Sequence, residues 1–241
     1  MSSNLTPSAT RRPALDNRAE AANVRAMARG RLITFEGGEG AGKSTQIAML
    51  AERLRAAGRS IVTTREPGGS PGAESIRGLL LTGEVDRWSP FTETLLMYAA
   101  RRDHIERVIE PALERGEWVL SDRFADSTRA YQGAAGGAPF ELIDALEAQT
   151  LGAARPDLTL ILDLPVEVGL ARAAERSHAE VRFEAKGLAF HQRLREAFRA
   201  IAEAEPARCV VIGASGSREA VAEAIWRAVA DRLGVQQREG A

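Results

Sequence analysis

Short runs of apolar residues alternate with longer segments of helical periodicity along most of this chain. The apolar runs predict β-strands at residues 32–35, 60–64, 118–120, 158–164 and 209–212. The periodic segments predict helices at residues 43–57, 71–81, 91–115, 140–151, 166–175, 184–204 and 218–233. Strands separated by helices form parallel βαβ units, because a parallel connection needs a crossover element. The pattern therefore predicts an α/β fold, a doubly wound parallel sheet with helices on both faces.

Residues 1–29 differ in composition from the rest of the chain. They contain two prolines, five arginines and no aromatic residue, and they show no strong apolar periodicity. We expect a disordered N-terminal extension; the alternatives are an upstream start, with the natural one at Met27, and a regulatory or targeting arm. One domain is expected over residues 30–236, and a short tail over residues 237–241.

Composition and charge exclude several classes of protein. Lys and Arg number 32 against 33 Asp and Glu, so the basic excess of a nucleic-acid-binding protein is missing. Cys209 is the single cysteine, which excludes an intramolecular disulfide and suits a reducing compartment. The apolar runs are far shorter than the roughly 20 residues of a membrane span. We therefore expect a cytoplasmic protein that binds neither nucleic acid nor membranes. No metal-ligand spacing relates the histidines His104, His178 and His191.

A glycine-rich loop follows the first predicted strand and opens the first predicted helix. Its sequence, GGEGAGKS at residues 37–44, matches the pattern GxxxxGK[ST]. Glycines let backbone N–H groups surround phosphate oxygens, and the N-terminus of the next helix favours the same anion. Lys43 would reach the β- and γ-phosphates of ATP, and the Ser44 hydroxyl would bind Mg²⁺. The residues expected to bind the nucleotide are Gly37, Gly38, Glu39, Gly40, Ala41, Gly42, Lys43, Ser44 and Thr45.

Other features of the sequence narrow the class of P-loop protein. A GTPase would carry an Asn-Lys-x-Asp motif, which this sequence lacks. A small-molecule kinase needs arginines that bind the acceptor and an arginine-rich lid, and the chain offers both. Asp122 follows the predicted strand 118–120, where the second acid of P-loop proteins binds Mg²⁺ directly or through water.

Five segments of the sequence resemble thymidylate (dTMP) kinases in order and spacing. They read FEGGEGAGKSTQ from residue 35, TREPGG from 64, YAAR from 98, SDRFADSTRAYQG from 121, and RPDLT from 155 running into LDLP at 162. The segment from residue 121 is far more specific than the glycine-rich loop. The likeness covers residues 30–233, which is nearly everything outside the N-terminal extension.

This resemblance implies a fold, an activity and an assembly. The fold would be that of a P-loop nucleoside monophosphate kinase, with a five-stranded parallel sheet flanked by helices. The activity would be phosphoryl transfer from ATP to dTMP with Mg²⁺, and relatives are homodimers. Two other interpretations stay open: a kinase for dUMP or UMP, and a nucleotide-binding switch that is not a kinase.

The resemblance also implies roles for individual residues. Arg123 would lie near the reacting phosphates, while Arg77 and Arg101 would hold the dTMP phosphate with planar guanidinium groups. Arg102 lies beside Arg101, so the sequence leaves open which of these two neighbouring arginines holds the phosphate. Further residues expected at the acceptor site are Glu39, near the 3′-hydroxyl, Tyr131, near the 2′ position, Gln132, near the pyrimidine, and Glu36, Arg65, Pro67, Met97 and Ser127. Pro67 is also a candidate for a cis peptide bond.

Met97 departs from the family pattern, which places phenylalanine four residues before Arg101 to stack on thymine. A thioether packs on a ring face with about 0.3–1.5 kcal/mol; alternatively, Tyr98 or Phe91 takes that role. The departure concerns base selectivity and not phosphoryl transfer. Gly213 stands where relatives often have aspartate, so the adenine contact stays open.

Residues 172–184 join two predicted helices and are expected to form the lid. The P-loop has no arginine, which is the pattern of the bacterial-like group that uses a lid arginine instead. Such an arginine would stabilise charge on the transferring phosphoryl group and help to exclude water. Arg182 is the first candidate, followed by Arg176 and Arg172.

Overall fold

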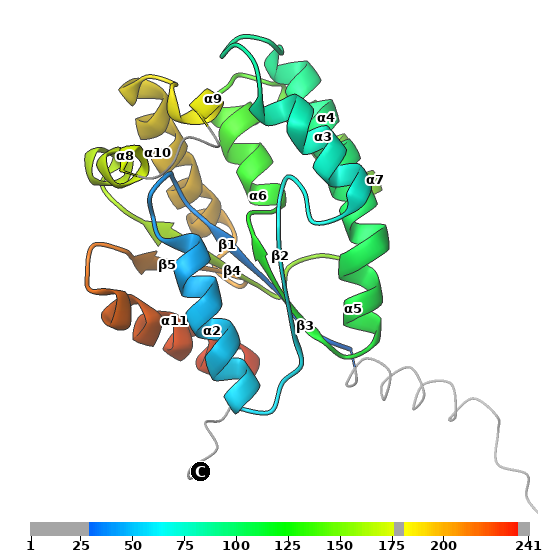
Figure 1. Cartoon of the computed structure of the whole chain (residues 1–241), viewed down its shortest axis with the longest axis vertical. Coiled ribbons are helices and arrows are strands. Elements are labelled where there is room, and N and C mark those ends of the chain that lie inside the picture. Colours follow the sequence, from blue (N-terminus) through cyan, green and yellow to red (C-terminus); the bar gives the residue numbers. More distant parts are fainter. Residues whose placement is uncertain (1–28, 176–180, 236–241) are drawn as a thin grey trace, which may run out of the picture.

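The computed structural model describes residues 29–175 and 181–235 (Figure 1). The expected N-terminal extension, apart from Arg29, and the expected tail at 237–241 lie outside the described residues. The lid candidate Arg176 and the histidine His178 also lie outside them.

The core of the fold is one parallel sheet of five strands, as the sequence pattern and the family resemblance predicted. Its order is β2-β3-β1-β4-β5. The strands are β1 Leu32–Glu36, β2 Ile61–Arg65, β3 Trp118–Asp122, β4 Leu158–Asp163 and β5 Cys209–Gly213. Since β1 lies between β3 and β4, the chain leaves the middle of the sheet in opposite directions after β1 and β3. The carboxyl ends of β1 and β3 therefore meet at the switch point where α/β proteins bind ligands.

Successive strand residues face opposite sides of the sheet and are covered by different helices. Ile33 packs in a core cluster with residues of two helices, α2 Lys43–Ala56 and α11 Arg218–Leu233. Leu32, the neighbouring residue, packs in a second cluster on the other face. The helices of that second face and of the segments around the site are α3 Pro71–Leu81, α4 Pro90–His104, α5 Glu110–Glu114, α6 Ala125–Thr128, α7 Phe140–Thr150, α8 Val166–Ala174, α9 Val181–Glu184 and α10 Leu188–Ala204 (Figure 1).

The structure differs from the elements expected from the sequence in three places. The single helix predicted at 91–115 is α4, a π-helical turn Ile105–Ile109 and α5. Pro111 has no N–H to bond the carbonyl four residues earlier, so the regular hydrogen-bond pattern is interrupted there. The helix predicted from residue 184 begins at Leu188, after the extended Gly187, and the short α9 precedes it.

The third difference is a helical segment that the apolar pattern did not predict. α6 continues into a π-helical segment, Arg129–Ala134. Its sequence, ADSTRAYQGA, contains many small and polar residues, so no apolar stripe marks it. Tyr131 and Gln132 lie on this segment and are buried.

Candidate active site

The P-loop is held against the rest of the sheet by close backbone approaches that need glycine. A Cβ atom on Gly37 would lie 2.4 Å from the carbonyl oxygen of Leu162, and one on Gly40 would lie 2.0 Å from that of Gly169. Both glycines also have positive φ, at 128° and 66°. The loop therefore rests on β4 and α8, and its conformation is fixed by packing as well as by sequence.

Lys43 begins α2 and folds back over the P-loop. Its Nζ donates to the carbonyl oxygens of Gly37 at 3.3 Å and Gly38 at 3.0 Å. Burial is the largest influence on its amine and lowers the pKa of Lys43, and the charge of Arg123 acts in the same direction. The lysine therefore lies within the loop, where the phosphates of a bound nucleotide would replace its carbonyl partners.

Ser44 and Asp122 place two oxygen ligands side by side at the end of β3. The Ser44 hydroxyl donates to Asp122 Oδ2 at 2.8 Å. A hydroxyl and a carboxylate are the hard oxygen ligands that Mg²⁺ takes beside nucleotide phosphates. The two residues therefore fit a magnesium ion. Within the described parts of the chain, no group of three or more His, Cys, Asp and Glu side chains is arranged to hold a metal.

A cleft opens next to the P-loop, with Glu39 and Arg123 in its wall. Its lining residues are Glu39, Glu66, Pro67, Arg77, Leu81, Met97, Arg101, Arg123, Phe124, Ser127, Thr128, Tyr131, Gln132 and Phe183. The structure thus brings together all the predicted acceptor-site residues except Glu36, which lies behind the cleft, and Arg65. That arginine is exposed, pairs with Glu74 and borders a separate opening beside Ser44 and Asp122.

Arg123 joins the cleft to the P-loop. Its Nη1 donates to the Gly37 carbonyl at 2.9 Å and to Ser127 Oγ at 3.3 Å, and its Nη2 donates to Glu39 Oε1 at 3.0 Å. Its φ of 70° is the left-handed conformation that side chains rarely adopt. Such backbone strain concentrates at functional sites, where the surrounding structure maintains it.

Glu39 is ionised in this arrangement. Burial opposes its charge, but the nearby cations Arg123 and Lys43 outweigh that effect and lower its pKa to about 2. The Tyr131 hydroxyl donates to Glu39 Oε1 at 2.5 Å, and the Arg123 guanidinium lies 4.8 Å from the centre of the Tyr131 ring. These three side chains form one fixed group at the P-loop side of the cleft.

Arg101 lies deeper and has different partners. Its Nε donates to Glu66 Oε2 at 2.8 Å, and its Nη2 donates to the Phe124 carbonyl at 3.0 Å and to Thr128 Oγ1 at 3.1 Å. The third nitrogen, Nη1, is buried without a hydrogen-bond partner. Because a buried donor without a partner costs free energy, this atom indicates the place of a ligand acceptor.

Comparisons with known proteins agree with this geometry. The family model described as Thymidylate kinase matches residues 35–225. The thymidylate kinase of Caulobacter vibrioides is 66% identical over 209 residues, covering 87% of this chain and 100% of the relative. The thymidylate kinase of Bradyrhizobium diazoefficiens is 58% identical over 216 residues, covering 89% of this chain and 95% of the relative. The chain belongs to the thymidylate kinase family.

A solved structure supports the same assignment. The crystal structure of thymidylate kinase from Ehrlichia chaffeensis matches with a TM-score of 0.68 and 33% sequence identity, over 83% of this chain and 99% of that one. The fold is that of a P-loop nucleoside monophosphate kinase, and the activity is ATP-dependent phosphorylation of dTMP. In the described part of the chain, no helix is long and apolar enough to cross a membrane.

The candidates for a thymine-stacking residue lie in different places. Met97 lines the cleft, whereas Tyr98 is 2% exposed in the second core cluster and Phe91 is 48% exposed. Neither aromatic alternative borders the cleft. Besides Tyr131, the aromatic residues Phe124 and Phe183 border the cleft. The sequence analysis did not name Phe124 or Phe183 as site residues. Phe124 could have been named, because it lies inside the SDRFADST segment.

The two lid arginines within the described residues also lie in different environments. Arg172 is half-buried at the end of α8. Arg182 is buried, pairs with Glu93, and donates from Nε to the Glu84 carbonyl at 2.9 Å and from Nη1 to the Leu80 carbonyl at 3.1 Å. All three of its nitrogens therefore have protein partners on the acceptor side. This arrangement argues against a contact between Arg182, the first lid candidate, and the transferring phosphoryl group.

Pro67 and His104, which the sequence analysis also named, both lie beside Glu66. The Glu66–Pro67 peptide bond is cis, as predicted. His104 is fully buried, with Nδ1 2.9 Å from Glu66 Oε1 and Nε2 2.6 Å from Thr64 Oγ1. Glu66 thus contacts both His104 and Arg101 and was missed as a residue of the cleft. The sequence feature that could have identified Glu66 is its position within the TREPGG segment.

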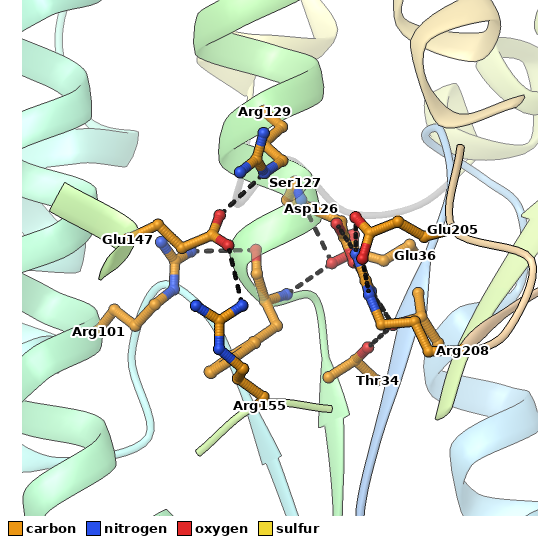
Figure 2. A network of polar contacts seen from close by, with 12 residues as sticks. Thr34, Glu36, Arg101, Asp126, Ser127, Arg129, Glu147, Arg155, Glu205 and Arg208 are labelled. Carbon is orange, nitrogen blue, oxygen red and sulfur yellow. Dashed lines mark hydrogen bonds and ion pairs between the residues drawn. The ribbon is translucent and has the colours of Figure 1, made fainter. Parts of the chain in front are cut away.

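Glu36, at the end of β1, is a buried carboxyl group beside another acid (Figure 2). It accepts from the Phe124 backbone N–H at 2.8 Å and lies 2.6 Å from Ser127 Oγ, while Asp126 nearby pairs with Arg208. Burial, and next the Asp126 carboxylate, raise the pKa of Glu36 to about 8. This environment therefore favours the neutral, protonated form of Glu36.

Stability is expected to fall as the pH rises towards and through 8. The folded state binds the Glu36 proton more tightly than the unfolded state, so this contribution is complete below the unfolded pKa of 4.5 and is lost as the pH passes the folded value of about 8. Glu36→Gln, which mimics the neutral acid, should flatten the fall in Tm between pH 6 and 9. In chains of this size about 1 kcal/mol corresponds to roughly 2–4 °C. Superimposable pH profiles of the two proteins would contradict this protonation state.

Proposed function

We propose that dTMP binds in the cleft with its phosphate beside Arg123, its 3′-hydroxyl near Glu39, and its base beside Arg101 and Gln132. The observation that carries this orientation is that Arg123 bonds directly to the P-loop at Gly37, where the donor phosphates bind. The reacting phosphate must lie at that end of the cleft, because in-line transfer needs the two nucleotides end to end.

This orientation changes the role expected for Arg101. The family resemblance implied that Arg77 and Arg101 both hold the acceptor phosphate. Arg77 donates to the Pro67 carbonyl at 2.5 Å and lines the cleft, and we keep it as a phosphate-binding residue with Arg123. The unpartnered Nη1 of Arg101 instead suits a carbonyl oxygen of the base, since its other nitrogens are fixed by Glu66, Phe124 and Thr128.

The reaction needs positioning and charge stabilisation rather than a covalent intermediate. Lys43 neutralises charge on the donor phosphates, and Arg123 orients the acceptor phosphate for attack. The acceptor phosphate is itself an adequate nucleophile, so no general base is required. Arg172 and Arg176 remain the proposed lid cations. When bound by Ser44 and Asp122, Mg²⁺ would supply further neutralisation of the donor phosphates.

A coupled assay of ADP release tests the function directly. With ATP and Mg²⁺ present, dTMP should be the preferred acceptor over dUMP, UMP, dCMP and AMP. A preference for another acceptor would keep the kinase chemistry and change its substrate, and a lack of acceptor-stimulated turnover in folded protein would favour the nucleotide-binding switch. Turnover that persists in excess chelator would contradict the magnesium proposal.

Assembly, location and domain organisation are further parts of this proposal. Exposed apolar residues on α4, Phe91 and Leu95, suit a homodimer interface that buries them, and sedimentation as a monomer at micromolar concentration would refute it. A cytoplasmic location fits the buried, unpaired Cys209 and is tested by cell fractionation. We also propose one kinase domain over residues 30–236; limited proteolysis that cleaves it into two stable fragments would argue against that.

A further inference from the structure

A buried carboxylate joins the two sides of the acceptor cleft behind the lining residues. Glu93, on α4, is 3% exposed and contacts a different partner with each oxygen. Its Oε1 pairs with Arg182 Nη2, and its Oε2 accepts from Gln132 Nε2 at 3.2 Å. Glu93 does not line the cleft itself, whereas Gln132 does. The carboxylate therefore contacts the acceptor site only through another side chain.

Arg182 fixes the charge and position of this carboxylate. It lies on α9, 89 residues from Glu93 along the chain, and its side chain is 1% exposed. Its other nitrogens bond to the carbonyls of Leu80 and Glu84, so the guanidinium is held at three points. A buried carboxylate in contact with a fully bonded guanidinium is a hydrogen-bond acceptor at both oxygens.

This charge decides which way the Gln132 amide points. The nitrogen and oxygen of a glutamine amide are nearly indistinguishable by shape, and the assignment must follow the hydrogen-bond partners. Glu93 can only accept, so the amide nitrogen must face it and the carbonyl oxygen must lie at the other side of the planar group. Gln132 is 1% exposed and lies on the cleft wall, so an amide reversal would place two acceptors against each other.

We propose that Glu93, held by Arg182, is a positioning residue that sets the base specificity of the cleft through the Gln132 amide. This inference rests on the proposed orientation of dTMP. The amide oxygen faces the base as an acceptor, while Arg101 Nη1 offers a donor. Thymine and uracil present the complementary pair, an N3–H donor beside the O4 acceptor. Cytosine presents the reverse pair, an unprotonated N3 and an amino group, so both contacts would be mismatched.

Glu93→Gln tests the proposal, because it keeps the size of the side chain and removes its acceptor-only character. With a neutral amide in place of the Glu93 carboxylate, the Gln132 amide is free to turn, so its oxygen no longer always faces the base. We expect the KM for dTMP to rise by about tenfold or more, since a hydrogen bond to a charged group is stronger than a neutral one and would no longer fix the Gln132 amide. The ratio of kcat/KM for dTMP over dCMP should fall by about tenfold, while the KM for ATP stays unchanged.

The selectivity ratio separates positioning from a merely structural role. A structural defect would lower Tm and the active fraction, and it would reduce turnover of both acceptors equally. Glu106→Gln is the matched control, because that glutamate also pairs with an arginine, Arg102, but is exposed. If Glu93→Gln does not fold, Glu93→Asp provides a second test. Aspartate keeps the charge but is shorter by one methylene, so its carboxylate lies farther from the Gln132 amide. The ratio of kcat/KM for dTMP over dCMP should therefore also fall.

Two outcomes separate a failure of this inference from a failure of the proposed function. Wild-type protein that does not phosphorylate dTMP would refute the proposed function. Wild-type protein that does, together with a folded Glu93 variant whose dTMP-to-dCMP ratio equals that of wild type, would overturn only the role of Glu93.

Discussion

Lys43→Ala is expected to lower kcat by about two to three orders of magnitude, the loss typical of removing one preorganised group that stabilises charge in a transition state. The lysine is buried within the P-loop, with carbonyl oxygens as partners. Those contacts hold the ammonium group where phosphate oxygens bind. Single-turnover measurement with saturating ATP and dTMP reports the chemical step without product release.

The folded state should tolerate this substitution. Burial lowers the pKa of Lys43, which means that the surroundings disfavour its charged form when no nucleotide is bound. Removing the charge therefore removes a cost as well as two hydrogen bonds, and Tm should change little. Arg55→Ala is the control, because Arg55 is an exposed cation on the same helix. A Lys43→Ala enzyme with near-normal kcat would refute the proposed role.

The sequence was most informative where local rules act alone. The segment from β1 through the P-loop to α2 combines an apolar run, obligatory glycines and a helical stripe, and each is visible within a few residues. The family motifs then placed most of the predicted acceptor residues at one cleft. Arg65 is an exception, because strand alternation turns its side chain outwards to Glu74.

The features that were missed depend on partners distant in the chain. Arg182 is expected from the sequence to be a lid cation because it lies in the arginine-bearing segment 172–184 between two predicted helices, yet it is buried and bonded to Glu93 and to two carbonyls from the α3 region. The helical segment after β3 carries no apolar stripe, and it is held by contacts from α4, α7 and α10. Periodicity and local charge do not predict contacts between residues that are distant in the chain, so these contacts became visible only in the structure.

Arg123→Lys is expected to lower kcat/KM for dTMP by about two orders of magnitude, mainly through a higher KM. The guanidinium of Arg123 holds Glu39, Ser127 and the Gly37 carbonyl at once, and a planar group can do so while presenting a face to Tyr131. Lysine keeps the charge but cannot reproduce this fork, and arginine and lysine are not interchangeable at such sites.

The size of this effect follows from what the substitution leaves behind. Glu39 and Arg123 are each about 14% exposed at their side chains, so a loosened ion pair leaves a poorly solvated carboxylate next to the incoming phosphate dianion. Repulsion between these anions would weaken acceptor binding more than it would slow the chemical step. Arg129→Lys is the matched control: Arg129 also pairs with carboxylates, those of Asp144 and Glu147, but does not line the cleft. Unchanged kinetics for Arg123→Lys, or an equal loss in both variants, would show that the acceptor phosphate lies elsewhere.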